Sequence, residues 1–267
     1  MPEASASLQC ETRYNTHNIT IESPMLYTLF SPSEGKHHGG DAGPLNALLF
    51  GLDARRELLE RYDNIINSGD MERIKALFGY KKESDCLPYV GALFETATMP
   101  AIERYDGVAY DYLDTASLSE NAMAYLKSHT VIFSNLYGPI MGGDLIADYK
   151  VKQGNDINGI APDLYYKQAF SEDLDNLLEA HEILDLRAGY YDKFYKPSQS
   201  FTTLKFIKEG KVVSHWAKAY RGTVLRKLAL HGVDSLEALM KLEIEGLMVN
   251  EIKKIGKKME IVFDIVS

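Results

Sequence analysis

The stretch HWAKAYRGTVLRKLALHG, residues 215–232, separates its apolar and basic residues at the spacing of a helix. An apolar row recurring every four residues is typical of a helix face packed on a protein core. The members of this row are Trp216, Tyr220, Val224 and Leu228. Three basic residues fall on an arc of roughly 140° on the other side. They are Lys218, Arg221 and Arg226. The stretch therefore predicts a helix that packs one side on the protein core and presents a basic side to a binding partner.

Gly222 lies in the middle of the basic arc. A glycine inside a helix costs about 1 kcal/mol relative to alanine, so its presence indicates the close approach of another group. That group is either an anion or the backbone of a neighbouring element, and a basic face that is merely solvated is a third interpretation. Ser214 is suited to cap the start of the helix and Gly232 its end.

The length of 267 residues and the hydrophobic content of 45% favour one domain. Residues 1–24 are polar and lack an apolar period, so we interpret them as a disordered arm or a start assigned too early, with the domain over 25–267. The two cysteines exclude a disulfide framework. Because the cysteines are so few and we find no apolar run of about 18 residues and no leader pattern, we expect a cytoplasmic protein without a membrane role. We also expect a monomer.

Charge is distributed unevenly along the chain, whose formal net charge is −9. Residues 193–258 carry 14 Lys and Arg against 6 Asp and Glu, and the remainder is strongly acidic. Such an asymmetry suggests a basic surface on an acidic body. It would also arise if the two segments simply pair with each other in the fold.

A polar loop follows the first predicted strand. Residues 26–30 are apolar, as in a buried strand, and SPSEGKHHGGDAG follows at 31–43. Ser31, Ser33 and Lys36, with free N–H groups around the glycine, could hold a phosphate or a carboxylate. The loop is not a Walker P-loop, because the glycine, lysine and serine spacing of that motif is absent.

The same loop contains His37, His38 and Asp41, which are residue types that ligate metals. Adjacent histidines point apart, and no second ligand cluster stands out. We therefore favour a glycine-rich surface turn and expect neither a metal nor another cofactor.

Two further polar clusters follow predicted strands. The strand 130–133 leads into residues 134–154, which contain Tyr137 and Asp144 among closely spaced glycines. The strand 183–186 leads into a segment with Tyr191. Ordering tightly specified turns costs conformational entropy. These loops therefore indicate either a site that is built from the ends of strands or plain tight connections.

The remaining pattern mixes helices and strands without regular alternation. We predict helices at 53–69, 70–78, 88–104, 119–127, 172–180 and 236–241, a hairpin of strands 202–207 and 211–213, and closing strands near 247 and at 261–266. This arrangement indicates an α+β fold, a single compact domain with a mixed sheet and helices around it.

Four segments, in order along the chain, resemble the YaaA family of peroxide stress proteins. FSPSEGK at 30–36 resembles the family's opening strand and Ser-Pro loop, and YDGVAY at 105–110 its G-x-x-Y segment. SNLYGPIMGGD at 134–144 is similar to S-G-L-Y-G-x-x-x-P-x-D, and AKAYRG at 217–222 to A-K-x-x-R-G. The chain has Gly142-Gly143 where many members carry Arg-Pro, and residues 184–191 match the N-L-A-S-x-E-Y pattern poorly, so we place it in a divergent branch.

The resemblance implies a compact α+β fold with a positively charged cleft, binding of double-stranded DNA, and limitation of oxidative damage through lowered free iron. It attaches no firm reaction to the family. Our first hypothesis is therefore a DNA-binding protein of the peroxide stress response that recognises backbone or shape. Its phosphate contacts would be Lys36, Lys218, Arg221 and Arg226.

The alternative hypothesis is an enzyme or a small-anion-binding protein in which the three strand-end loops converge on one pocket. A concave site of a few hundred Å³ would favour this alternative, and an open basic groove as wide as a duplex would favour DNA. A scaffold role is the weakest possibility, because we find no heptads. The residues around the ligand would be Ser31, Lys36, Tyr110, Tyr137, Asp144, Lys218 and Arg221, with Asp144 or a tyrosine carrying a proton.

Overall fold

The sheet at the centre of the protein is built on β1 (Leu26–Phe30), whose five residues are all buried. In the computed structural model, which describes residues 24–266 apart from the side chains of Ser214 and His215, β1 pairs in parallel with β5 (Thr130–Ser134) and with β8 (Glu182–Asp185). The expected arm at residues 1–24 therefore lies, except for Pro24, outside the described residues.

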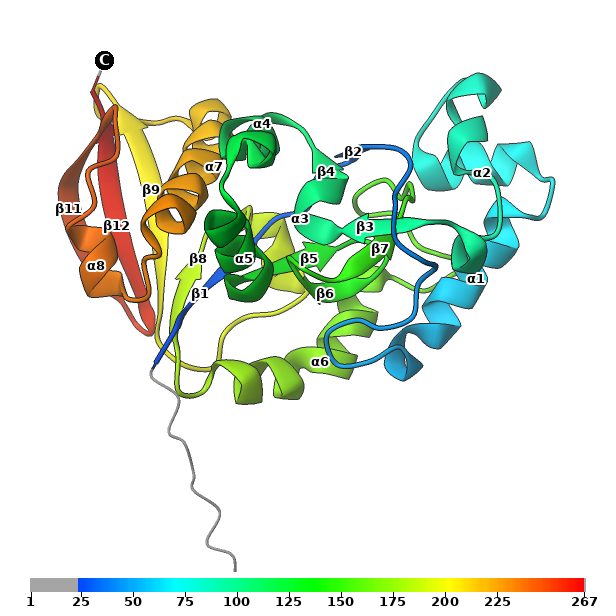
Figure 1. The fold of residues 1–267 in the computed structure, drawn as a ribbon, viewed down its shortest axis with the longest axis horizontal. Coiled ribbons are helices and arrows are strands. Elements are labelled where there is room, and N and C mark those ends of the chain that lie inside the picture. Colours follow the sequence, from blue (N-terminus) through cyan, green and yellow to red (C-terminus); the bar gives the residue numbers. More distant parts are fainter. Residues whose placement is uncertain (1–23, 267) are drawn as a thin grey trace, which may run out of the picture.

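The sheet extends from this centre to two antiparallel edges. Its strands run in the order β11-β12-β9-β8-β1-β5-β6, with β10 paired to β9 (Figure 1). β5, β1, β8, β9 and β12 are parallel to one another, whereas β6, β10 and β11 are antiparallel to their neighbours. The outer strands are β6 (Gly138–Met141), β9 (Phe201–Lys208), β10 (Lys211–Val212), β11 (Leu247–Ile255) and β12 (Lys258–Ile265).

The order of the parallel strands creates a switch point between β1 and β8. Taken along the chain, these strands stand second, first, third, fourth and fifth, as in the doubly wound flavodoxin-like sheets. The chain leaves β1 toward β5 on one side, and leaves β8 toward β9 on the other. Because the two connections diverge, a crevice opens beyond the carboxyl ends of β1 and β8, where open α/β sheets bind their ligands.

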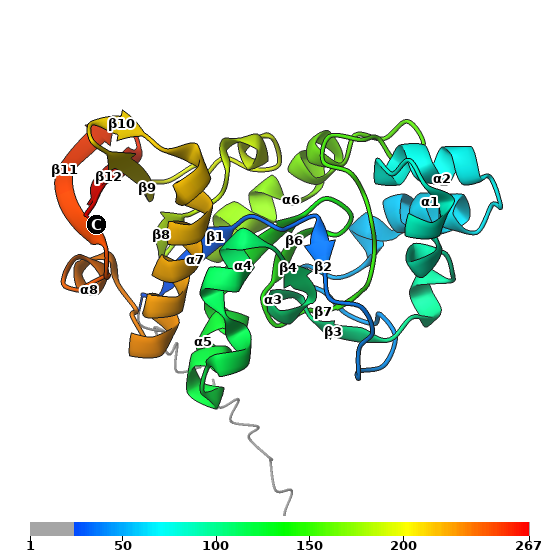
Figure 2. The same cartoon turned by 90° about the horizontal axis from the view of Figure 1, so that it is seen from above.

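Helices cover both faces of the sheet. Figure 2 shows α4 (Val108–Leu113), α5 (Glu120–His129) and α7 (Ser214–His231) on one face and α6 (Pro162–Leu178) on the other. Three further helices lie toward the ends of the molecule, namely α1 (Arg56–Ile66), α2 (Met71–Phe78) and α8 (Leu236–Met240). The prediction of one domain with a mixed sheet and surrounding helices is thus confirmed, and the parallel strands at the centre of the sheet give it an α/β core.

The helix predicted from residues 215–232 is α7. Val224 and Leu228 are fully buried, as predicted, and Gly232 ends the helix in the left-handed conformation with φ 58°. Trp216, by contrast, is 48% exposed. The first turn of α7 follows directly on the β9–β10 hairpin, and the indole lies near the Lys208 ammonium instead of on the core.

Gly222 is explained by the close packing of α7 on α4. A Cβ at this position would lie only 1.9 Å from the carbonyl oxygen of Ala109, so no side chain fits there. The backbone of α4 occupies the gap in the basic face. Of the interpretations of this glycine, close approach by a neighbouring backbone is therefore the one the structure supports.

Two of the predicted helices differ from the structure. Residues 88–104 form 3₁₀ turns, then β3 (Thr98–Pro100) and the single turn α3 (Ala101–Arg104), because Thr98 to Pro100 pair with β7 (Leu145–Ala147) and Pro100 lacks the N–H that a helix needs. α6 begins ten residues before the expected 172, at Pro162 in its first turn. A row every four residues marks its buried side: Tyr166, Phe170, Leu174 and Leu178.

A small second sheet fixes the loop after β1. β2 (Gly35–Lys36) pairs with β4 (Tyr105–Asp106), directly before α4. A Cβ on Gly35 would lie 2.8 Å from the carbonyl oxygen of Asp106, so the two strands approach more closely than most residues allow. The loop is thereby held beside α4 at the carboxyl end of β1. No helix within residues 24–266 has the length and apolar character needed to cross a membrane.

Candidate anion-binding pocket

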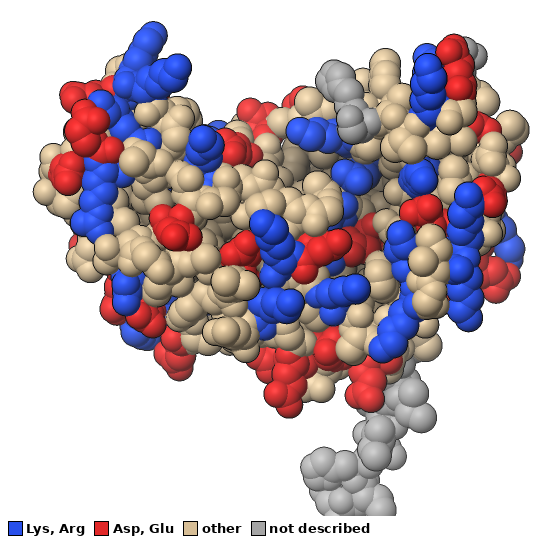
Figure 3. All heavy atoms as spheres, turned by 180° about the vertical axis from the view of Figure 1, so that it is seen from behind, with Lys and Arg blue, Asp and Glu red and all other residues tan. Residues whose placement is uncertain are grey.

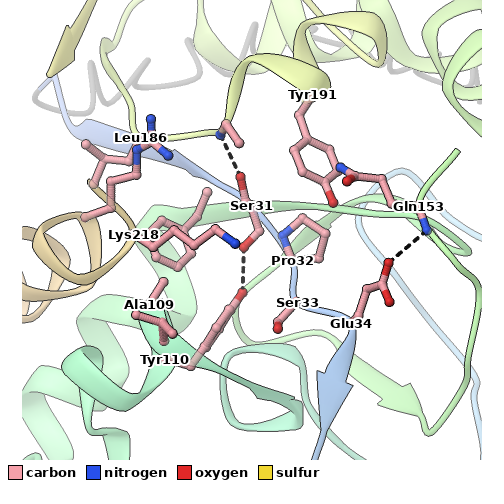
Figure 4. Close-up of a pocket in the computed structure, with 14 residues that line it drawn as sticks. Ser31, Pro32, Ser33, Glu34, Ala109, Tyr110, Gln153, Leu186, Tyr191 and Lys218 are labelled. Atoms are coloured by element: carbon pink, nitrogen blue, oxygen red, sulfur yellow. Dashed lines mark hydrogen bonds between the residues drawn. The ribbon is translucent and has the colours of Figure 1, made fainter. Parts of the chain in front are cut away.

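A cavity of about 400 Å³ lies at the switch point, beyond the carboxyl ends of β1 and β8 and against α4 and α7 (Figure 4). Four predicted site residues come together in its lining, namely Ser31, Tyr110, Lys218 and Arg221. The rest of the lining is Phe30, Pro32, Ser33, Glu34, Val108, Ala109, Gln153, Leu186, Ala188 and Tyr191.

Ser31, the first residue after β1, is held by hydrogen bonds on two sides. Its carbonyl oxygen accepts from the Tyr110 hydroxyl at 2.9 Å, and its Oγ accepts from the backbone N–H of Ala188 at 2.8 Å. Both bonds use Ser31 as acceptor, so its hydroxyl proton remains for a ligand. Burial raises the pKa of Tyr110 well above its ordinary value, which keeps this phenol a neutral donor. Ser31 is thus a positioned hydrogen-bond donor in the cavity.

Lys218 and Arg221 bring two positive charges from α7 to the same cavity. Figure 4 shows the Lys218 amine extended toward Ser31. Within the described part of the chain, which leaves out the side chains of Ser214 and His215, neither side chain takes part in a hydrogen bond or an ion pair. Burial lowers the pKa of Arg221, and the charge of Asp185 acts in the opposite direction. A guanidinium stays charged in proteins, so this half-buried cation has lost water without gaining a partner.

The end of β8 is fixed by a buried pair that the sequence did not reveal. Arg187 donates to both oxygens of Asp185, from Nε to Oδ1 at 2.9 Å and from a terminal nitrogen to Oδ2 at 2.7 Å. The other terminal nitrogen donates to the carbonyl oxygens of Tyr191 and Tyr195 at 3.2 and 3.0 Å. The pair therefore holds the turn that carries the Tyr191 ring. An aspartate and an arginine two residues apart at a strand end were the only signal available.

Glu34 and Gln153 lie at the side of the cavity away from Lys218 (Figure 4). The Glu34 carboxylate accepts from the Lys150 amine at 3.1 Å and from the backbone N–H of Gln153 at 3.2 Å. Burial alone would raise the pKa of Glu34, but these two donors outweigh it and the pKa is lowered. Glu34 is consequently a fixed negative charge opposite the two cations.

Lys36 lies behind the cavity wall and does not line it. Its side chain is buried, donates to the carbonyl oxygens of Ser33 and Glu34 at 3.2 and 3.4 Å, and lies 4.0 Å from the ring centre of Tyr149. Burial, with a smaller effect from the charge of Lys150, lowers the pKa of Lys36 to about 7. In this position Lys36 shapes the loop after β1.

Tyr137 and Asp144 also lie outside the cavity lining. The buried Tyr137 hydroxyl donates to the carbonyl oxygen of Ala147 at 3.3 Å. Oδ2 of Asp144 accepts from the backbone N–H groups of Leu49 and Met141 at 2.8 and 2.9 Å. Both side chains tie loops to the β5–β6 edge of the sheet.

Arg226 is occupied by the end of α4. It donates to the carbonyl oxygens of Leu113 and Asp114, each at 2.8 Å, and to the Ser117 hydroxyl at 2.7 Å. A carboxylate oxygen of Asp114 lies 3.4 Å from the same guanidinium. Arg226 thus fastens α7 to α4, and its donors are directed at the protein.

On the surface outside the cavity, basic and acidic side chains are interspersed (Figure 3). Figure 3 shows one face of the molecule, on which Lys and Arg are interspersed with Asp and Glu and do not gather on a continuous basic surface. Several lysines of the basic segment are in local pairs, such as Lys253 with Glu251 at 2.8 Å and Lys241 with Glu237 at 2.5 Å. Within the described chain, no three His, Cys, Asp or Glu side chains gather as metal ligands, and His38 instead lies 2.5 Å from an Asp148 oxygen.

The fold and the cavity define an α/β protein that presents a cation-lined pocket at the carboxyl ends of parallel strands. Comparison with known protein families then identifies the family to which the chain belongs. The model of the peroxide stress protein YaaA family matches residues 26–253, and the chain therefore belongs to this family.

The relatives point to the same family. An uncharacterized protein of Campylobacter jejuni is 41% identical over 243 residues, which cover 90% of this chain and 99% of the relative. A UPF0246 protein of Streptomyces coelicolor is 30% identical, covering 78% of this chain and 84% of the relative. A UPF0246 protein of Corynebacterium glutamicum is 29% identical over 85% of this chain and 95% of its own length.

Proposed function

We propose that this member of the YaaA family acts in the peroxide stress response by binding a small anionic ligand, a phosphate or a carboxylate, in the switch-point cavity. The observation that carries the proposal is the meeting of two cations, Lys218 and Arg221, with the free hydroxyl proton of Ser31. Neither cation has a hydrogen-bond or ion-pair partner among the side chains and backbone groups that the structure describes. A bound anion would supply the hydrogen bonds that the half-buried guanidinium lacks.

The dimensions of the site support a small ligand over a duplex. A cavity of about 400 Å³ falls in the range of small-molecule sites. A duplex exposes one phosphate charge about every 1.7 Å of its axis and needs a row of cations along an open surface. Lys36 and Arg226, two of the four expected phosphate contacts, direct their donors at protein carbonyls instead.

Binding of double-stranded DNA, and with it protection against iron-dependent damage, is our second proposal. It rests on family membership and on Lys218, whose side chain is exposed on α7. In this proposal the amine would contact a backbone phosphate, and the cavity would have no part in binding.

Calorimetric titration with inorganic phosphate tests the first proposal. We expect the wild type to bind and Arg221→Gln and Lys218→Met each to weaken binding by at least about tenfold, since each removes a charge-assisted contact. Lys227→Met, on the same helix but outside this cavity, is the matched control and should leave binding unchanged.

A duplex titration at two salt concentrations separates the two proposals. The first proposal would be replaced by the second if two results were found together. The protein would bind the duplex in a salt-sensitive way that Lys218→Met abolishes, and it would not bind inorganic phosphate. Circular dichroism of each variant establishes that a lost affinity does not reflect a lost fold.

A further inference from the structure

The cavity has two ends of different chemistry, and this difference narrows the chemistry of its ligand. Lys218 and Arg221 of α7 form the cationic end. Glu34 and Gln153 form the other end, and Figure 4 shows them on the far side of Ser31 from Lys218. A plain inorganic anion would use only the first end, so the second calls for a ligand with hydrogen-bond donors away from its charge.

Apolar and aromatic side chains make up part of the lining of the cavity, namely Phe30, Val108, Tyr110, Leu186 and Tyr191. Tyr110 and Tyr191 are each less than a tenth exposed. Tyr110 is held by its hydrogen bond to Ser31, and the Tyr191 ring packs against Tyr190 and Phe194. Fixed aromatic rings of this kind suit a flat, conjugated ligand body.

The end of the cavity formed by Glu34 and Gln153 offers hydrogen-bond acceptors to a ligand. Each Glu34 oxygen has one protein donor, Lys150 or the Gln153 N–H, and each therefore keeps lone pairs for a ligand. The Glu34 side chain is 48% exposed, so it is accessible from the mouth. The Gln153 side-chain amide beside it offers both a donor and an acceptor.

We propose that the ligand is a guanine nucleoside monophosphate, with its phosphate at Lys218 and Arg221 and its base edge at Glu34 and Gln153; this inference rests on the anion-binding function proposed above. Guanine presents two N–H donors side by side, which a carboxylate can accept, next to a carbonyl oxygen that an amide N–H can reach. Adenine presents a ring acceptor at the corresponding place, which would face the carboxylate and be repelled. A cavity of about 400 Å³ at a switch point is a suitable size and place for a mononucleotide.

The test is calorimetric titration of the full chain with GMP, AMP, guanosine and inorganic phosphate. We expect GMP to bind at least about tenfold more tightly than AMP and than phosphate, as a lost base-edge pair would cost. Guanosine should bind far more weakly than GMP. Equal affinity for GMP and AMP, or no gain of GMP over phosphate, would overturn the inference.

Variants locate the base edge. Glu34→Gln should bring the affinity for GMP down to that for AMP, and the exposed Glu60→Gln on α1 is the matched control that should keep the preference for GMP. Gln153→Ala, whose side chain makes no hydrogen bond within residues 24–266, is the second variant if the loss of the Glu34 charge impairs folding. A GMP preference that survives both substitutions would also overturn the inference.

The two proposals fail in different ways. Phosphate binding that is lost in Arg221→Gln, without any preference among nucleotides, removes the guanine inference and keeps the anion-binding function. Absence of binding for all four compounds removes both.

Discussion

Two arginines of α7 carry the same side chain in different surroundings. Arg221, near the middle of the helix, faces a cavity and has no hydrogen-bond partner in the described chain, whereas Arg226, little more than a turn later, donates to two carbonyl oxygens and a hydroxyl of the α4 region. Both belong to one basic arc of the sequence. The comparison teaches that the donors of a cation stay free for a ligand where no backbone carbonyl reaches them, and serve the fold where one does.

The largest effect should come from Gly222, which brings α7 and α4 together for both roles. Gly222→Ala places a methyl group 1.9 Å from the Ala109 carbonyl oxygen, and the helices must separate. We expect a loss of unfolding free energy of about 3 kcal/mol, measured by urea denaturation. Gly43→Ala is the control, because a Cβ there meets nothing within 4 Å. A loss no larger than that of the control would refute the close packing.

The two arginines should separate stability from binding. Arg226→Met removes donors from the carbonyl oxygens of Leu113 and Asp114 and should cost about 2 kcal/mol of unfolding free energy, with phosphate binding kept. Arg221→Met should leave stability unchanged or raise it slightly, since a half-buried charge without a partner disappears, and should abolish binding. Denaturation and calorimetry on both variants check this, and equal losses of stability would contradict the comparison.

Lys36 makes the unfolding free energy depend on pH. Its pKa is about 7 in the folded protein and about 10.4 in an unfolded chain, so the unfolded state binds more protons between these values. The unfolding free energy should therefore rise with pH through this window, by at most about 1.4 kcal/mol per pH unit. Below pH 7 both states are protonated and the contribution is flat.

Lys36→Met should remove that rise. Denaturation between pH 7 and 9.5 measures it, and the range stops there because burial raises the pKa of tyrosines such as Tyr105, to about 12, which reverses the trend at higher pH. A variant with the same slope as the wild type would show that the rise has another source.

The smallest effect belongs to cations in exposed surface pairs. Lys241 pairs with Glu237 one helical turn away, and both side chains are largely exposed. Lys241→Met should change the unfolding free energy by less than about 0.5 kcal/mol and leave phosphate binding intact. A larger change in either measurement would show that an exposed surface cation also contributes to stability or to binding, which the comparison of Arg221 with Arg226 does not predict.

Local patterns were read correctly where one segment determines its own structure. The apolar run 26–30 is β1, and the helix predicted at 70–78 is α2, capped by Asp70, whose side chain accepts from the Arg73 N–H. Residues 88–104 were misread because their apolar spacing suits a helix, and the partner that makes Thr98 to Pro100 a strand comes more than 40 residues later. Spacing within a segment carries no information about such a partner.

The site was predictable in part for the same reason. Ser31, Tyr110, Lys218 and Arg221 line the cavity as predicted for a pocket of strand-end loops. That the donors of Arg226 would be occupied depends on carbonyl oxygens 112 and 113 positions away, which no pattern near position 226 encodes. Whether the four lining residues bind a ligand stays a prediction.

The strand order has an evolutionary consequence. The cavity is assembled from the loop after β1, the start of α4, the loop at Gln153, the end of β8 and one face of α7, which are widely separated in the sequence. Each can mutate without disturbing the parallel strands that carry them. A lineage could exchange the Glu34 and Gln153 end, and so acquire a different ligand, while Gly222 and Arg226 continue to hold the same scaffold.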